Sequence, residues 1–225
     1  MNLLVFGGTG KLGEALRGDI ARRRAWDKPA EGFFAVFCGR KDFDFGAGPA
    51  GSAPKEKDFM DFIKAVNPDC VINAAAVTDV ALCESNPWKG FGVNAGKLDI
   101  IQRLLDSARL GATFCMSDES GLFCPTYAPS LAATILRMLA RGIPPGIYHA
   151  CGNPTDMEGY VKFIIRAASG RFDNLKIERM TPERNHRKPL NVVLDCAKLR
   201  STEVLGPVMW QAGVLQYFHE LTEEP

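Results

Sequence analysis

Three glycines near the start of the chain constrain its fold more than any other feature. Gly7, Gly10 and Gly13 follow an apolar run at residues 2–6, and apolar residues then recur at helical spacing over 12–20. This order predicts a strand, a glycine turn and an amphipathic helix. Such a turn lets backbone N–H groups approach a pyrophosphate at the positive end of the helix. The pattern therefore predicts a dinucleotide site. Its expected cofactor-binding residues are Gly7, Thr9, Gly10, Lys11, Leu12 and Gly13.

The second apolar run ends in the basic sequence Gly39-Arg40-Lys41. A site that prefers NAD places a carboxylate at this position, against the ribose 2′-hydroxyl. A guanidinium instead pairs with a 2′-phosphate and stacks on the adenine. Arg40, assisted by Lys41 or Lys11, therefore predicts NADP, with NADPH preferred over NADH. The alternative is a solvated loop arginine, and two aspartates follow closely in the sequence.

Apolar runs alternate with helical patterns along the rest of the chain. This alternation predicts an α/β protein with a parallel, doubly wound sheet. The run from Cys70 ends in small side chains that let a cofactor lie close, which adds Asn73, Ala74, Ala75 and Ala76 to the candidate site. The expected strands are 2–6, 33–38, 70–76, 112–116, 147–151 and 175–180. The expected helices begin near residues 12, 59, 86, 131, 155 and 208.

Composition excludes several classes of function. The 225 residues carry a formal net charge of +1, which gives no field to attract a phosphate backbone, so we expect no nucleic-acid partner. The apolar start is too short for a signal peptide or a membrane span. Seven cysteines without a CxxC pair favour reduced thiols in the cytoplasm. The three histidines do not cluster, so we expect no metal site.

Several separate segments resemble one family. They are LLVFGGTGKLGEAL, PDCVINAAAVTDVALCESNP, VNA at 93–95, PTYAPSLA, GIYHACG and the tail around RKPLN and LDCAKL. Together they are similar to the extended short-chain dehydrogenase/reductases, and within these to the dTDP-4-dehydrorhamnose reductase type of sugar nucleotide-binding protein. The resemblance implies a Rossmann-type sheet and a small C-terminal α/β substrate lobe. It adds Asn94 to the cofactor residues and Arg187 to the substrate residues.

The resemblance also implies a domain division. Residues 1–152 are expected to form the NADP-binding Rossmann domain, including a returning helix and strand at 130–152. Residues 153–225 are expected to form the small lobe, which does not fold independently.

The catalytic pair of the family is missing from this chain. In the family a Tyr donates a proton to the carbonyl, and a Lys four residues later lowers its pKa. The four tyrosines here are followed at that spacing by Leu131, Gly152, Ile164 and Leu221. The resemblance implies that the chain is shortened in the middle, at Asp118-Glu119. Ser117 matches the family's catalytic Ser or Thr, and Tyr127 is the best substitute for the Tyr. The alternatives are a structural hydroxyl and a loop side chain.

Two functions follow, and whether the chain is an enzyme stays open between them. The first is an NADPH-dependent oxidoreductase of the short-chain type that reduces a nucleotide-linked 4-keto sugar. The second is a non-catalytic NADP-binding regulatory or scaffold protein, as the regulatory β-subunit of methionine adenosyltransferase resembles this family. The expected partners are a nucleotide-sugar substrate, and either a second copy of the chain or another protein.

Overall fold

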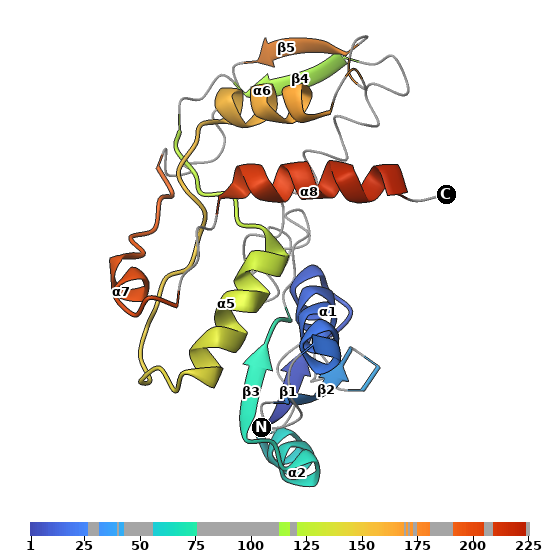
Figure 1. Cartoon of the computed structure of the whole chain (residues 1–225), viewed down its shortest axis with the longest axis vertical. Coiled ribbons are helices and arrows are strands. Elements are labelled where there is room, and N and C mark those ends of the chain that lie inside the picture. The colour runs from blue at the N-terminus through green and yellow to red at the C-terminus, as the bar shows by residue number, and fades with distance from the viewer. Residues whose placement is uncertain are drawn as a thin grey trace. The chain divides into compact units, whose positions relative to one another are not determined.

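The chain consists of two compact units. The first comprises Met1–Ala95 and Ile135–Arg141, and the second comprises Gly96–Thr134 and Gly142–Pro225. The expected boundary after residue 152 stays a prediction, because this grouping reflects packing rather than independent folding. A computed structural model (Figure 1) describes residues 1–26, 32–39, 41–42, 56–75, 113–117, 121–168, 170, 172, 175–180, 191–204 and 209–223.

The first unit is built on a parallel sheet with the strand order β2-β1-β3. The strands are β1 (Asn2–Phe6), β2 (Phe34–Cys38) and β3 (Cys70–Asn73). Leu4 pairs with Val36 on one side and Val71 on the other. β1 is buried from its second residue to its last, as its continuous apolar sequence requires of a central parallel strand. The predicted α/β class and parallel sheet are confirmed.

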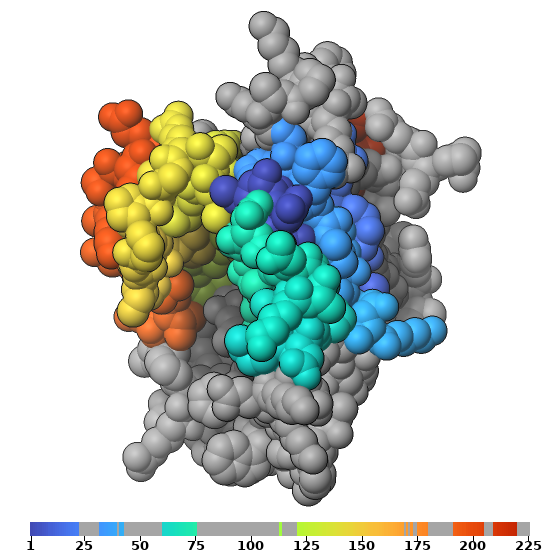
Figure 2. Space-filling model, turned by 90° about the horizontal axis from the view of Figure 1, so that it is seen from below, coloured from blue at the N-terminus to red at the C-terminus, as the bar shows by residue number. Residues whose placement is uncertain are grey.

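Two helices cover opposite faces of this sheet. α2 (Glu56–Val66) packs Phe62, Ile63 and Val66 against the cluster Leu4, Phe6 and Cys38. On α1 (Lys11–Trp26), the Arg17 guanidinium lies 4.1 Å from the centre of the Phe37 ring. Phe37 and Cys38 are adjacent in β2, so their side chains point to opposite faces. In Figure 2, α2 and β3 (teal) form one continuous surface of this unit.

The second unit contains a separate parallel ladder. β4 (Thr113–Ser117) pairs with β5 (Lys176–Met180), with Thr113 opposite Lys176 and Ser117 opposite Met180. We expected a strand at 112–116, and the structure has it at Thr113–Ser117. An apolar run encodes an extended, buried strand, but it does not encode which edge that strand will pair with.

Aromatic side chains dominate the core of the second unit. Tyr160 lies edge-on to Trp210 at 5.0 Å and to Phe123 at 5.6 Å between ring centroids. The helices are α5 (Ala128–Ala140), whose last residues group with the first unit, α6 (Met157–Ala167), α7 (Ala197–Arg200) and α8 (Trp210–Glu223). The buried cluster is Phe123, Tyr160, Val161, Ile164, Ala168, Phe172, Trp210, Val214 and Phe218. Burial raises the pKa of Tyr160 to about 12. None of the described helices is long and apolar enough to cross a membrane.

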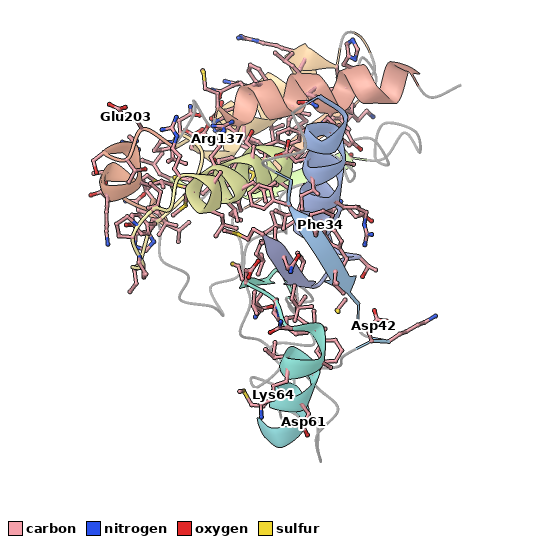
Figure 3. All side chains as sticks on the ribbon, turned by 60° about the horizontal axis from the view of Figure 1, so that its bottom comes forward. Phe34, Asp42, Asp61, Lys64, Arg137 and Glu203 are labelled. Carbon is pink, nitrogen blue, oxygen red and sulfur yellow. The ribbon has the colours of Figure 1, made fainter. Side chains whose placement is uncertain are left out.

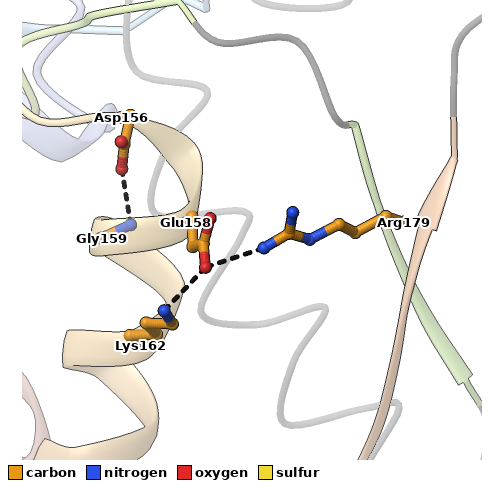
Figure 4. Close-up of polar contacts among 5 residues, drawn as sticks. All are labelled: Asp156, Glu158, Gly159, Lys162 and Arg179. Carbon is orange, nitrogen blue, oxygen red and sulfur yellow. Dashed lines mark hydrogen bonds and ion pairs between the residues drawn. The ribbon is translucent and has the colours of Figure 1, made fainter.

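The start of α6 is capped as its sequence predicts. The Asp156 carboxylate accepts a hydrogen bond of 2.6 Å from the Gly159 N–H. In the same first turn, Glu158 contacts Lys162 at 2.7 Å and Arg179 of β5 at 2.8 Å (Figure 4). The hydrogen bond from Lys162 and the charge of Arg179 lower the pKa of Glu158. The contact joins α6 to the β4–β5 ladder, and it weakens as the pH falls through this lowered pKa.

The segment at 147–151 is not a strand, which contradicts our expectation. It belongs to no strand ladder among the described residues, and Ile147 is 79% exposed. The Tyr148 hydroxyl donates a hydrogen bond of 3.0 Å to the Pro144 carbonyl, which is only four residues earlier in the chain. Phe123 instead forms isolated bridges with Thr155 and Val192. Both bridging partners of Phe123 therefore lie after the predicted strand in the sequence.

Candidate dinucleotide site

The strand order of the first sheet reverses at its central strand. The chain passes from β1 to β2 on one side and then crosses to β3 on the other, with α1 and α2 on opposite faces. In open parallel sheets, ligands bind outside the carboxyl ends of the strands where the order reverses in this way. That point lies here between the ends of β1 and β3, where Gly7 begins the glycine loop.

Gly7 has to be glycine for two reasons. Its φ of +73° is in the left-handed region. A Cβ at this position would also lie 2.5 Å from backbone atoms of Ala74 and Ala75, which follow β3. The residue therefore lets the chain turn sharply out of β1 against the end of the neighbouring strand.

Backbone hydrogen bonds tie the loop to both neighbours of β1. The Gly8 N–H donates to the Cys38 carbonyl at the end of β2 at 3.0 Å. The Ala74 N–H donates to the Phe6 carbonyl at 3.0 Å. Within the loop, Gly10 N–H donates to the Gly7 carbonyl at 2.9 Å. These bonds hold the loop in one conformation, as a preorganised binding site requires.

Gly13 and Gly10 serve different purposes. A Cβ on Gly13 would collide with the Gly7 carbonyl oxygen and lie 2.6 Å from Gly8 Cα, so this glycine lets α1 pack directly on the loop. A Cβ on Gly10 would meet only the Gly7 carbonyl oxygen, at 3.3 Å, and otherwise open space. The loop thus has no room for a side chain at Gly7 or Gly13, whereas Gly10 borders open space.

The open side faces the amino end of α1. Thr9, Gly10 and Lys11 are exposed there. The first N–H groups of a helix have no partner within the helix, and they carry its positive partial charge. The N–H groups of Lys11 and Leu12 begin α1 directly behind this surface. The arrangement fits a diphosphate, which needs several donors on a concave backbone.

A turn after β2 lies beside the glycine loop. The Gly39 N–H donates to the Asp42 carboxylate at 2.8 Å, and the Asp42 N–H donates to the Gly39 carbonyl at 3.1 Å. A Cβ on Gly39 would lie 3.4 Å from Thr9 Cγ2. Figure 3 shows Asp42 beyond the carboxyl end of β2, and Lys41 is exposed beside it. Our sequence reasoning missed this role of Asp42, whose side chain reaches back to the N–H three residues earlier.

Asn73 shapes the turn after β3, which lies beside Gly7. Its side-chain oxygen accepts a hydrogen bond of 3.0 Å from the Ala75 N–H. This bond turns the chain after β3 and holds Ala74 and Ala75 against Gly7. Ala74 and Ala75 carry only methyl groups, and their backbone lies close to Gly7. The structure thus brings together the glycine loop, Lys41, Asn73, Ala74 and Ala75 within the first unit.

The two candidate catalytic residues lie in the second unit. Ser117 is the last residue of β4. The Tyr127 ring lies against α8, since a Cβ on Gly213 would be 2.6 Å from its Cγ. Their catalytic roles stay predictions. Four other predicted site residues, Arg40, Ala76, Asn94 and Arg187, and the helix expected from Asn86, lie outside the described residues. Within the described ranges, no three His, Cys, Asp or Glu side chains form a group that could hold a metal ion.

Comparison with known families gives one match. Residues 1–110 match the RmlD substrate binding domain. This range contains the glycine loop, the turn after β2 and the end of β3. No curated protein matches the chain.

Solved structures with the same fold cover nearly the whole chain. A dTDP-4-dehydrorhamnose reductase from Clostridium acetobutylicum has a TM-score of 0.75 at 15% identity, over 99% of this chain and 100% of that one. The Bacillus anthracis dTDP-4-dehydrorhamnose reductase, in complex with NADP, has a TM-score of 0.66 at 14% identity, over 97% and 99%. A UDP-glucose 4-epimerase from Thermus thermophilus, in complex with NAD, has a TM-score of 0.69 at 13% identity, over the full length of both chains. The chain therefore has the Rossmann-type α/β fold of these sugar-nucleotide enzymes.

Proposed function

We propose that this chain, which resembles the dTDP-4-dehydrorhamnose reductases in its first 110 residues and in fold, is an NADP(H)-binding protein. The observation that carries the proposal is the glycine loop. It is hydrogen-bonded to the end of β2, it is packed closely at Gly7 and Gly13, and it is open at Gly10 beside the amino end of α1. The neighbour from B. anthracis holds NADP, which supports the choice of cofactor.

Each part of the site has a role in this proposal. The backbone N–H groups from Thr9 to Leu12 bind the pyrophosphate, because they lie at the positive end of α1. Arg40, with Lys41 or Lys11, binds the 2′-phosphate. The small residues at 73–76, together with Asn94, line the cofactor site on the side of β3. When bound, NADPH would supply a hydride to a carbonyl carbon.

The substrate we propose is a nucleotide-linked 4-keto sugar. The match to the RmlD substrate binding domain supports this class. In the proposed reduction, Ser117 polarises the carbonyl, Tyr127 gives the proton, and Arg187 pairs with the diphosphate of the sugar nucleotide. A protein with this cofactor and substrate would act in the cytoplasm.

Cofactor titration of an Arg40 variant tests the site. We expect the wild-type protein to bind NADPH more tightly than NADH, and Arg40→Ala to weaken NADPH binding by about tenfold or more because a bidentate phosphate contact is lost. NADH affinity should stay unchanged. Isothermal titration measures both. Arg22→Ala is the matched control, since Arg22 is an exposed arginine of α1 that contacts Asp19 instead. Equal affinities of the wild-type protein for NADPH and NADH would contradict the assignment.

A specific feature of the sequence favours a second function. No tyrosine of the 225 residues has a lysine four positions later, so the family's usual proton donor is missing. In this second function the chain binds NADP(H) without catalysis, as a regulatory or scaffold protein. Its partner is then another protein or a second copy of the chain. NADPH oxidation with a panel of nucleotide-linked 4-keto sugars separates the two functions. Turnover that Tyr127→Phe abolishes supports the reductase, whereas binding of NADPH without turnover supports the regulatory protein.

A further inference from the structure

Three thiols from distant parts of the chain meet in the second unit. The Cys151 and Cys196 sulfurs are 3.4 Å apart, although the residues are 45 positions apart in the sequence. Both sulfurs also lie close to the Leu194 carbonyl oxygen, at 3.7 and 3.8 Å. The Cys124 thiol lies near enough to Cys151 to contribute to raising its pKa. All three cysteines are free thiols in the structure.

Backbone contacts hold the three segments side by side. Phe123 exchanges two hydrogen bonds of 2.9 Å with Thr155. On its other side, the Val192 N–H donates to the Leu122 carbonyl at 2.9 Å, and the Leu122 N–H donates to Asn191 Oδ1 at 3.1 Å. The cysteines lie within a few residues of these contacts. Their proximity is therefore set by the backbone arrangement and not by long, mobile side chains.

The geometry at Cys151 and Cys196 suits bond formation. A disulfide has a sulfur–sulfur distance of about 2.05 Å, so the two sulfurs must approach by about 1.4 Å to form one. Cys196 is fully buried, whereas Cys151 is half-buried and accessible to a small reagent. Burial, and then the hydrogen bonds with Cys196 and Cys124, raise the pKa of Cys151 to about 12. The thiol is protonated at neutral pH, so exchange should speed up as the solution becomes more alkaline.

We propose that Cys151 and Cys196 form a reversible intrachain disulfide, with a small-molecule disulfide such as oxidised glutathione as the electron acceptor. Cys151 loses its proton to solvent, and its sulfur attacks the small disulfide. The sulfur–sulfur bond of the small disulfide breaks, and one small thiolate leaves and takes up a proton. Cys196 then loses its proton and attacks the Cys151 sulfur of the mixed disulfide, which releases the second small thiol. Two protein thiols are oxidised, and one small disulfide is reduced to two thiols.

The bond would join two segments that are otherwise linked by weaker contacts. Cys196 is the residue before α7, and Cys151 lies in the extended segment before α6. Cross-linking them restricts the unfolded chain over 45 positions and fixes the start of α7. This inference does not depend on the proposed cofactor or substrate.

Redox titration of the full chain tests the proposal. The chain carries Cys83→Ser and Cys115→Ser, because the side chains of these two cysteines lie outside those described. The protein is equilibrated with mixtures of reduced and oxidised glutathione, the free thiols are then alkylated, and tryptic peptides are identified by mass spectrometry. Trypsin places Cys124, Cys151 and Cys196 in three different peptides, since arginines or lysines separate them.

We expect a cross-linked peptide pair containing Cys151 and Cys196, with Cys38, Cys70 and Cys124 alkylated. The intact mass should fall by about 2 Da, and the Tm should rise by about 5 °C on oxidation. Cys151→Ser should remove the cross-link, and Cys38→Ser should leave it unchanged. Three results would overturn the proposal: a Cys124–Cys151 bond in place of the expected one, glutathione attached to Cys151 with no cross-link in the most oxidising mixture, or a cross-link that forms only in urea. The peptide map of the protein with Cys83→Ser and Cys115→Ser distinguishes these results even where the further variant Cys151→Ser fails to fold.

Discussion

Replacing Gly13 by alanine should weaken NADPH binding by at least about tenfold and lower the free energy of unfolding by about 3 kcal/mol. The new Cβ would collide with the Gly7 carbonyl oxygen and lie 2.6 Å from Gly8 Cα. Both neighbours are backbone atoms, so no change of rotamer relieves the overlap. α1 must move away from the loop, and its amino end then loses its position beside the pyrophosphate. Isothermal titration measures the affinity, and urea unfolding measures the stability.

Two other glycines provide matched controls for this variant. A Cβ on Gly18 of the same helix would meet only the end of the Arg22 side chain, at 3.6 Å. Gly18→Ala should therefore stabilise the protein by up to about 1 kcal/mol and leave binding unchanged. Gly10→Ala should weaken NADPH binding while changing stability by less than about 1 kcal/mol, because its Cβ enters the open side of the loop. If Gly13→Ala binds NADPH as tightly as the wild-type protein, the loop is not the phosphate site.

Trp210→Ala should lower the free energy of unfolding by about 3–5 kcal/mol. Trp210 is 5% exposed, and its ring packs edge-on to Tyr160 at 5.0 Å and to Phe163 at 5.1 Å. Removing the indole leaves a cavity at the contact between α6 and α8. Urea unfolding followed by far-UV circular dichroism measures the loss independently of tryptophan fluorescence.

A conservative variant separates ring packing from hydrogen bonding at this position. The Trp210 indole N–H is buried and has no hydrogen-bond partner in the part of the chain that the structure describes. Trp210→Phe should therefore cost about 1 kcal/mol, because it keeps much of the ring contact and loses no hydrogen bond of this kind. Leu215→Ala on α8 is the surface control, since Leu215 is 53% exposed, and it should cost less than about 0.5 kcal/mol. Equal losses for Trp210→Ala and Leu215→Ala would contradict the packing described for α8.

Local patterns in the sequence predicted much of the fold. The apolar run at 2–6 and the three glycines predicted β1, the turn and α1, because strand burial, positive φ and close packing each restrict which residues are allowed. The capping residue Asp156 and the amphipathic pattern after it predicted α6. The glycine loop was predictable for the same reason, since its residues are contiguous in the sequence and follow β1 directly.

Features that depend on distant partners could not be predicted. The sequence of β4 indicates a strand but does not indicate that β5, about sixty residues later, pairs with it. The three thiols of the second unit lie in unrelated sequence contexts, and the bridges of Phe123 and the hydrogen bonds of Leu122 bring their segments together. The role of Asp42 is intermediate, because its turn is local but its importance depends on Thr9 of the glycine loop lying beside it.

The position of α8 in the chain has a consequence for synthesis on the ribosome. The three described strands of the first unit lie within the first 73 residues, so they can pair once β3 has emerged. The aromatic cluster of the second unit instead needs Trp210, Val214 and Phe218 from the last helix. Until that helix leaves the exit tunnel, Phe123 and the apolar face of α6 have no cover. During this interval the nascent chain exposes the aromatic side chains of this cluster, which form the type of surface that general chaperones bind.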